Sequence, residues 1–229
     1  MDAIDFHSEL AESFIQNYSR KKNLKKRLAI WDLLIKKILP LDGVVLDAGC
    51  GPGTISDLVL DLKNCNVVAI DGSEKMIRYC SEKHKGNPRI SFSVKYIPED
   101  LPGYPDNHFD AILSSSVIEY VDNIEENISQ FLRILKRQGN LIISVPNRHS
   151  WFRKFERIDF KITGRPGYLR YSKNHFKVDQ IKSLLEMNNF FVKEIHFDGN
   201  VPFISKFLKM FFGDRIAKTM IVVVAGRTP

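Results

Sequence analysis

One short stretch constrains the fold of this chain more than any other, the run from Val44 to Thr54. Residues 44–46 are apolar and β-favouring without alternation, which is typical of a strand covered on both faces. Glycines at 49, 51 and 53 then allow positive φ angles and a close approach of a ligand to the backbone. A helix beginning at Thr54 would offer that ligand its free N–H groups. We expect a ligand-binding turn, and a turn that needs glycine for its geometry alone is the alternative.

Beyond this stretch, strands alternate with helices along the chain. The expected strands are 44–46, 65–70, 90–94, 109–113, 141–145, 190–197 and 220–225. The expected helices lie within 6–39, 54–62, 124–137, 178–187 and 201–212, and another begins at 72–74, whereas 147–174 has no clean period. This alternation predicts a doubly wound, mostly parallel seven-stranded α/β sheet with helices on both faces. We place the last strand, 220–225, antiparallel at an edge.

The composition fits one domain over residues 1–229, without a membrane span. Of the 229 residues, 44% are hydrophobic, and no run reaches the apolar length that crosses a bilayer. The N-terminus is acidic and lacks a signal-peptide pattern. Three cysteines, Cys50, Cys65 and Cys80, are odd in number and lack zinc-like spacing. We therefore expect free thiols in a cytoplasmic protein, and no metal site.

The positive charge of the chain is concentrated in one segment. The formal net charge is +7, and residues 145–177 alone hold nine Lys or Arg against two acids. A second basic run covers 20–27. Either segment suits an anionic lipid, an acidic substrate, a carrier protein or a nucleic acid, and a solvated surface is the alternative for each.

Two acids, Asp47 and Asp71, end the first two expected strands at the sheet edge where α/β proteins bind ligands. Asp71 follows Gly51 by 20 residues, an offset at which an acid accepts hydrogen bonds from both ribose hydroxyls. The spacing Gly-Cys-Gly-Pro-Gly differs from that of dinucleotide-binding proteins. Pro52 also removes a backbone donor that a pyrophosphate would use. These features favour a nucleoside ligand without a pyrophosphate.

Further motifs extend the pattern of the glycine turn. They are Val-Ala-Ile-Asp-Gly-Ser-Glu-Lys-Met-Ile at 68–77, Leu-Pro at 101–102, Asp-Asn-His-Phe-Asp at 106–110, Ser-Ser-Ser-Val-Ile-Glu-Tyr-Val at 114–121 and Leu-Arg-Ile-Leu-Lys at 132–136. With these motifs the chain resembles the class I S-adenosylmethionine-dependent methyltransferases, of the type 11 and quinone-biosynthesis kind, over nearly its whole length. The resemblance implies a Rossmann-like fold and S-adenosylmethionine as cofactor, with S-adenosylhomocysteine as product.

The resemblance also implies which residues hold the cofactor. The turn at Gly49 and Gly51 would pass under the methionine portion. Asp47 would organise that turn and bind the methionine ammonium, directly or through water. Asp71 would hold the ribose, and Ser114 would offer its backbone near the methionine group.

At the adenine end, the resemblance implies Gly72 and Met76 as neighbours of the base. Met76 suits plain packing between helix and sheet equally well. The family often has an Asp after the third strand, where this chain has Tyr96 followed by Ile97. Either Tyr96 stacks on the adenine, or the acids at 99–100 reach back to it.

The implied reaction is in-line attack of a nucleophile on the sulfonium methyl, for which the protein aligns and dehydrates the pair. An oxygen or carbon nucleophile of high pKa also needs a general base, whereas an amine or thiol can do without one. The candidates are His149, Tyr120, His175 and Glu119. We favour His149, which follows a central strand, and Tyr120, which stands where the family commonly has His. A surface histidine and a core tyrosine are the alternatives.

The substrate side is expected from residues 1–40 as a helical lid, and from substrate-side insertions at 147–177 and 198–217. Phe14, Tyr18 and Trp31 are the aromatic residues expected in the lid, unless these helices only cap the sheet edge. The segments 151–162 and 203–212 mix aromatic and cationic residues. We expect them to pack over the substrate pocket as ordinary core, and helices lying in a membrane interface are the alternative.

The expected function is therefore methyl transfer to a small-molecule or lipid-linked acceptor, with peripheral membrane contact left open. One alternative is an RNA or protein methyltransferase that uses the basic segments as its footprint. Nucleic acid is not the expected partner, because the chain has no Asn-Pro-Pro-Tyr motif and no appended nucleic-acid-binding module. The other alternative is a non-catalytic binding module that keeps the cofactor fold.

Overall fold

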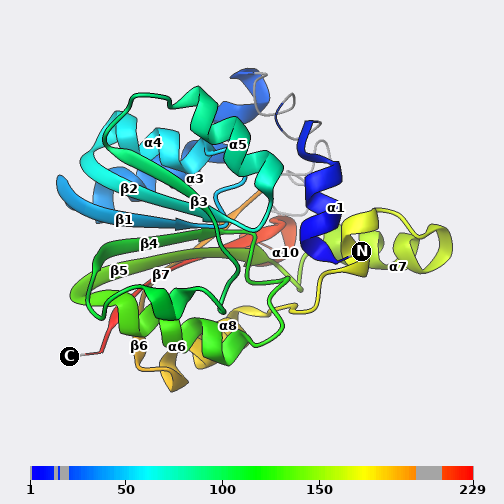
Figure 1. Cartoon of the computed structure of the whole chain (residues 1–229). Coiled ribbons are helices and arrows are strands. Elements are labelled where there is room, and N and C mark those ends of the chain that lie inside the picture. Colours follow the sequence, from blue (N-terminus) through cyan, green and yellow to red (C-terminus); the bar gives the residue numbers. More distant parts are fainter. Residues whose placement is uncertain (1, 13–14, 16–20, 200–212, 229) are drawn as a thin grey trace.

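A computed structural model describes residues 2–12, 15, 21–199 and 213–228, and its centre is a seven-stranded sheet (Figure 1). The strands are β1 (Asp42–Ala48), β2 (Asn64–Asp71), β3 (Ile90–Val94), β4 (Phe109–Ser115), β5 (Leu135–Pro146), β6 (Phe190–Asp198) and β7 (Met220–Arg227). Their order across the sheet is β3-β2-β1-β4-β5-β7-β6, and only β7 runs antiparallel among them. The predicted doubly wound, mostly parallel sheet is confirmed.

Helices cover both faces of the sheet. They are α1 (Ala3–Glu9), α3 (Lys21–Ile38), α4 (Thr54–Leu62), α5 (Glu74–Lys83), α6 (Ile124–Ile134), α7 (Trp151–Thr163), α8 (Val178–Met187) and α10 (Asp214–Ala217), with 3-10 turns η1 (Leu101–Gly103) and η2 (Gly167–Arg170). One buried cluster joins α3, α4 and α5 to the sheet, and a second joins α6 and α8 to the opposite face (Figure 1). Within the described ranges, no helix combines the length and hydropathy that a bilayer crossing requires.

The bounds of α4, α8 and β3 are those expected from the sequence. The expected helix 124–137 is shorter, because α6 ends at Ile134 and β5 already begins at Leu135. Leu135 is extended and pairs with Phe109 of β4, and an irregularity in the register follows. The Nζ of Lys136 then pairs with both carboxylate oxygens of Asp110 at 2.8 Å. Pairing with β4 therefore overrides the helical pattern at these residues.

The antiparallel strand lies one place in from the edge at which we expected it. β7 pairs with β5 on one side and with β6 on the other, so that β6 forms the edge. Residues Ile221 to Ala225 of β7 are all buried, whereas most of β6 is only half-buried or exposed. The more apolar strand thus occupies the position with two neighbours. Residues 201–212, expected to be helical, lie outside the described residues.

The core beneath α6 gives the first prediction. Phe131 on α6 is 0% exposed, so Phe131→Ala should lower the free energy of unfolding by about 3–5 kcal/mol, measured by urea denaturation. Met187 is 80% exposed, and Met187→Ala should change that free energy by less than about 0.5 kcal/mol. Equal effects of the two substitutions would contradict this description of the core.

Candidate cofactor and substrate site

The glycine turn has the backbone that its sequence predicts. Gly49, Gly51 and Gly53 have φ angles of 79°, 50° and 75°, and α4 begins immediately afterwards at Thr54. The N–H groups of Gly49 and Cys50 both donate to the carbonyl oxygen of Ile70, at 2.8 and 2.9 Å. These bonds fasten the turn that follows β1 to the carboxyl end of β2.

Gly49 and Gly51 differ in the free space beside their backbone. A Cβ atom added to Gly49 would lie 2.2 Å from a side-chain carbon of Val117, so this side packs against the segment after β4. Among the described residues, no atom beyond the chain neighbours of Gly51 would lie within 4 Å of a Cβ added to it. Within this part of the chain the Gly51 backbone therefore faces open space, as a turn that passes beneath a ligand requires.

Asp71 connects the glycine turn to the start of α5. Its Oδ2 accepts a hydrogen bond from the Gly51 N–H at 2.9 Å, and its Oδ1 accepts one from the Ser73 N–H at 2.8 Å. Burial raises the pKa of this carboxyl, and the two backbone donors oppose the shift. Each carboxylate oxygen keeps a further lone pair, so the group fits the ribose-binding role that the resemblance implies.

Asp47 is a carboxyl group held in the interior below the turn. It is 1% exposed, and the Oγ of Ser56 on α4 donates to its Oδ2 at 2.6 Å. Burial raises the pKa of Asp47 to about 7, and the Ser56 hydroxyl opposes that shift. Such a group is stabilised in its charged form by a cation brought beside it. The methionine ammonium fits this requirement.

The N-terminal helix α1 packs over the end of β2. A Cβ added to Gly72 would lie 2.6 Å from the Ile4 side chain, and the Ser8 hydroxyl donates to Ser73 Oγ at 2.7 Å. Ser73 caps α5 as expected, since its Oγ accepts from the Met76 N–H at 3.4 Å. Met76 itself is buried. Helix α1 therefore borders the place that the resemblance gives to the adenine and ribose.

The other residues expected in a lid behave differently from α1. Trp31 of α3 is 4% exposed and packs in the cluster that joins α3 and α4 to the sheet. Trp31 thus belongs to the core beneath α3, as a helix that caps the sheet requires, and its place over the cofactor stays a prediction. Phe14 and Tyr18 lie outside the described residues.

The residues after β3, where this chain lacks the Asp that the family often has, form a local turn. Tyr96 is 48% exposed, and its N–H donates to Asp100 Oδ2 at 2.7 Å. Ile97 packs against the core at the opposite face from α3. One oxygen of Asp100 is therefore engaged within the turn, while the ring of Tyr96 stays accessible. The adenine contacts expected of Tyr96 and Ile97 stay predictions.

The segment after β4 brings a second buried carboxyl to the same edge of the sheet. Glu119 is 2% exposed, and among the described residues its Oε2 has no hydrogen-bond partner. Burial raises its pKa to about 8, and the nearby Arg153 cation opposes the shift. Sequence reasoning placed Glu119 behind His149 and Tyr120, because the residues around it in the sequence do not reveal that it is enclosed.

Tyr120 stands beside this carboxyl and under α1. Its ring meets that of His7 edge to face, with centroids 4.9 Å apart. Burial, and then the neighbouring Glu119 charge, raise the pKa of Tyr120. The phenol therefore stays neutral and suits a hydrogen-bond donor better than a base.

The two histidine candidates have other neighbours. Burial and the cations of Arg215 and Lys177 lower the pKa of His149, and the backbone N–H of this residue donates to Asn147 Oδ1 at 3.0 Å. Burial and the charge of Arg157 lower the pKa of His175. The charges that act on the pKa of His149 lie on or beside α7, α8 and α10. The charge that acts on the pKa of Glu119 is that of Arg153, which is also on α7. The role of His149 stays a prediction.

Ser114 lies at the end of β4, fully buried and opposite Ile143 of β5 in the ladder. Among the described residues its Oγ has no hydrogen-bond partner. The backbone of Ser114 thus takes part in the pairing of β4 with β5, and its expected contact with the methionine group stays a prediction.

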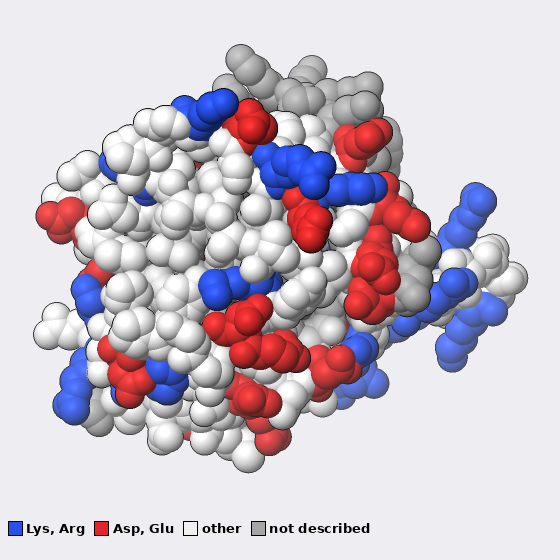
Figure 2. Space-filling view, in the orientation of Figure 1, with Lys and Arg blue, Asp and Glu red and all other residues white. Residues whose placement is uncertain are grey.

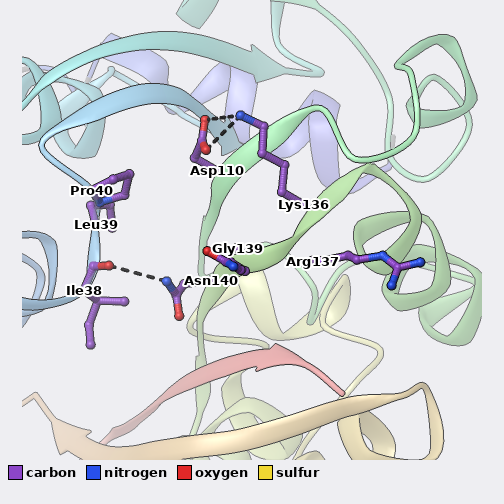
Figure 3. A pocket seen from close by; sticks show the side chains of 9 residues that line it. Ile38, Leu39, Pro40, Asp110, Lys136, Arg137, Gly139 and Asn140 are labelled. Carbon is purple, nitrogen blue, oxygen red and sulfur yellow. Dashed lines mark hydrogen bonds and ion pairs between the residues drawn. The ribbon is translucent and has the colours of Figure 1, made fainter. Parts of the chain in front are cut away.

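A cavity of about 500 Å³ lies at the other end of the strands (Figure 3). Its lining includes Leu39 and Pro40 before β1, Asp110 at the start of β4, and Gly139 and Asn140 of β5. The Asn140 side chain there donates to the Ile38 carbonyl at 3.4 Å (Figure 3). The motifs of the glycine turn lie at the opposite edge, so this cavity does not belong to the site.

Comparisons with known proteins agree with this geometry. Residues 46–143 match the model of a methyltransferase domain. An uncharacterized protein of Methanocaldococcus jannaschii is 30% identical, with 71% of this chain and 66% of the relative covered. The mitochondrial ubiquinone biosynthesis O-methyltransferase of Dictyostelium discoideum is 32% identical, with 58% of this chain and 45% of the relative covered. The chain thus spans about half to two-thirds of the length of these relatives.

A solved structure shows the same fold. The S-adenosylmethionine-dependent methyltransferase of Archaeoglobus fulgidus superposes with a TM-score of 0.69 at 19% identity, covering 94% of this chain and 99% of that chain. The matched domain, the relatives and this fold together show that the chain belongs to the class I S-adenosylmethionine-dependent methyltransferases. S-adenosylmethionine is accordingly its cofactor.

Asp71 gives the second prediction. Asp71→Asn replaces an acceptor with an amide, which puts a donor against one of the two backbone N–H groups and removes the charge. We expect affinity for S-adenosylhomocysteine, measured by titration calorimetry, to fall by about 10-fold or more. Asp61→Asn, an exposed acid on α4, is the matched control and should bind as the unmodified protein does. Unchanged affinity in Asp71→Asn would remove Asp71 from the site.

The pKa of Asp47 gives the third prediction. Near pH 7 this carboxyl is partly protonated in the free protein, and an ammonium beside it favours the carboxylate. Binding of S-adenosylhomocysteine should therefore release protons between about pH 6 and 7, and affinity should rise with pH in that interval. Calorimetry in two buffers of different ionisation enthalpy measures this release. Asp47→Asn should abolish it, and equal heats in both buffers for the unmodified protein would contradict the assignment.

Proposed function

We propose that this protein transfers the methyl group of S-adenosylmethionine to a hydroxyl group of a small or lipid-linked acceptor, and that Glu119 is the general base. The observation that carries the proposal is a fully buried carboxyl with a raised pKa in the segment that follows β4. A base with a pKa near the working pH is the kind that proton abstraction from a hydroxyl requires.

The position of Glu119 supports this role. Val117, two residues earlier, contacts Gly49 of the turn that would lie beneath the methionine portion. The backbone carbonyl of Glu119 accepts hydrogen bonds from the N–H groups of Lys173 and Asn174, at 2.8 and 3.0 Å. The Asn174 side chain also donates to the carbonyls of Ile118 and Val121. The segment that carries the base is therefore held by the chain between α7 and α8.

The roles of Glu119 and Tyr120 follow from where the proton of the acceptor hydroxyl goes. When bound, the cofactor would supply a sulfonium-activated methyl group to the acceptor oxygen, and the electron pair of the broken carbon–sulfur bond would stay on sulfur. In this proposal Glu119 takes the hydroxyl proton, and Tyr120 donates a hydrogen bond to the acceptor. Glu119 is buried and Tyr120 is partly buried, which limits the access of water to the reacting pair.

The name of one relative supports an oxygen acceptor, since the Dictyostelium discoideum protein is a ubiquinone biosynthesis O-methyltransferase. The direct test is transfer of labelled methyl to catechol, and to a catechol that carries an alkyl tail. Methylation of RNA or of protein, with none of either catechol, would contradict the proposed acceptor class.

Glu119→Gln gives the fourth prediction. The amide keeps the size of the side chain but accepts no proton, so kcat should fall by about 10²- to 10⁴-fold. In the unmodified protein, kcat/KM should rise with pH up to about 8 as the carboxyl ionises, and the variant should lose this limb. Affinity for S-adenosylhomocysteine should stay unchanged, which separates a missing base from a damaged fold.

The matched control is Glu125→Gln, an exposed acid in the first turn of α6. It should keep both the rate and the pH profile. A Glu119→Gln variant that retains the same pH-dependent limb would assign that limb to another group, and Glu119 would not be the base.

A further inference from the structure

Helix α7 leaves a row of large apolar side chains in solvent. The structure buries no side chain of this helix. Its exposed fractions are 41% for Trp151, 60% for Phe155, 55% for Ile158 and 79% for Ile162. In Figure 1 the helix projects from the body of the molecule, beyond the edge of the sheet where α1 lies. The expectation that residues 151–162 pack over the pocket as core is therefore wrong.

These four residues form one stripe along the helix. Their spacings of four, three and four residues return to the same face of a helix. The opposite face holds α7 to the protein. There Arg153 donates to the hydroxyl of Tyr168 in η2 and to the carbonyl of Thr219, at 3.4 Å in the latter case. It also pairs with Glu156 on the same face of the helix. The attachment through this polar face keeps the apolar stripe turned outward.

A cationic row runs beside the stripe. Lys154, Arg157 and Lys161 are spaced three and four residues apart, so they also share a face. The Nζ of Lys154 lies 5.5 Å from the centre of the Trp151 ring, which joins the two rows. Figure 2 shows basic side chains gathered on the projecting part of the molecule where Figure 1 places α7.

We infer that α7 lies in the interface of an anionic lipid bilayer. An apolar stripe with aromatic residues, flanked by Lys and Arg, is the pattern of a helix that sits at the boundary of headgroups and acyl chains. The cationic row complements anionic headgroups, which attract each such residue near the surface. A stripe of four large apolar residues exposed on a projecting helix otherwise opposes solubility.

The same helix adjoins the proposed catalytic residues. It begins five residues after the end of β5, and the charge of its Arg153 acts on both Glu119 and Tyr120. Docking of α7 therefore brings the carboxyl edge of the sheet close to the bilayer. This step rests on the proposed function and narrows its acceptor to one with a lipid tail, drawn from the membrane.

Vesicle co-sedimentation tests the docking. The full chain should sediment with phosphatidylcholine vesicles that contain phosphatidylglycerol, less with pure phosphatidylcholine, and less in high salt. Phe155→Glu/Ile162→Glu should weaken partition at least roughly tenfold, since two apolar side chains are lost from the interface. Lys154→Glu/Lys161→Glu should remove the preference for the anionic vesicles.

Met187→Glu is the matched control. Met187 ends α8 and is 80% exposed, so it tests the effect of one exposed apolar side chain outside α7. The control should sediment as the unmodified protein does. Absence of sedimentation with both kinds of vesicle would overturn the proposal, and so would equal partition of the stripe variant and the control.

Two further readouts distinguish membrane docking from self-association and from a loss of catalytic competence. Light scattering that shows a dimer for the unmodified chain and a monomer for Phe155→Glu/Ile162→Glu would assign the stripe to a protein interface and overturn the proposal. The stripe variant should keep its affinity for S-adenosylhomocysteine and its turnover of soluble catechol, while losing turnover of tailed catechol in vesicles. Sedimentation with no turnover of either catechol would leave the docking supported and would contradict the proposed function instead.

Discussion

The carboxylate of Asp71 holds together the two turns on which the cofactor site depends. Its oxygens accept one backbone N–H from the glycine turn and one from the start of α5, so a single half-buried group sets the ends of β1 and β2 relative to each other. Hydrogen bonds to an ionised group contribute about 1.5–3 kcal/mol each. The open space above Gly51 and the buried Asp47 below it can form one cofactor site only if that alignment is kept.

The sequence predicts the backbone geometry of these turns well because the determinants are local. Positive φ angles need glycine, and a strand that ends in an acid places that acid at the sheet edge, so residues 49–53 and 71 are identifiable from the sequence alone. The start of β5 and the inner position of β7 depend on pairing between distant segments, which periodicity does not report. Enclosure of Glu119 likewise depends on the chain at 173–174 and is invisible in its sequence neighbours.

Helix α7 shows the reverse case, in which the composition is informative and the packing expected from it is wrong. Aromatic residues at Phe152 and Phe160 obscure the regular stripe at 151, 155, 158 and 162, so the segment reads as aperiodic. The structure separates the two faces, because Arg153 and Glu156 pair on the attached side. The side chains that face solvent and Arg153, whose charge acts on Glu119, thus belong to one element, which connects the surface of the protein to its proposed chemistry.

Hydrogen exchange with and without S-adenosylhomocysteine tests the central claim, that the carboxyl edge of the sheet binds the cofactor. On binding, exchange should become slower for the backbone at 49–53 and 71–76, where the turns meet. Exchange should not change at 38–40 and 136–140, which line the cavity at the opposite edge. Protection at that cavity, with unaltered exchange in the glycine turn, would contradict binding at the carboxyl edge.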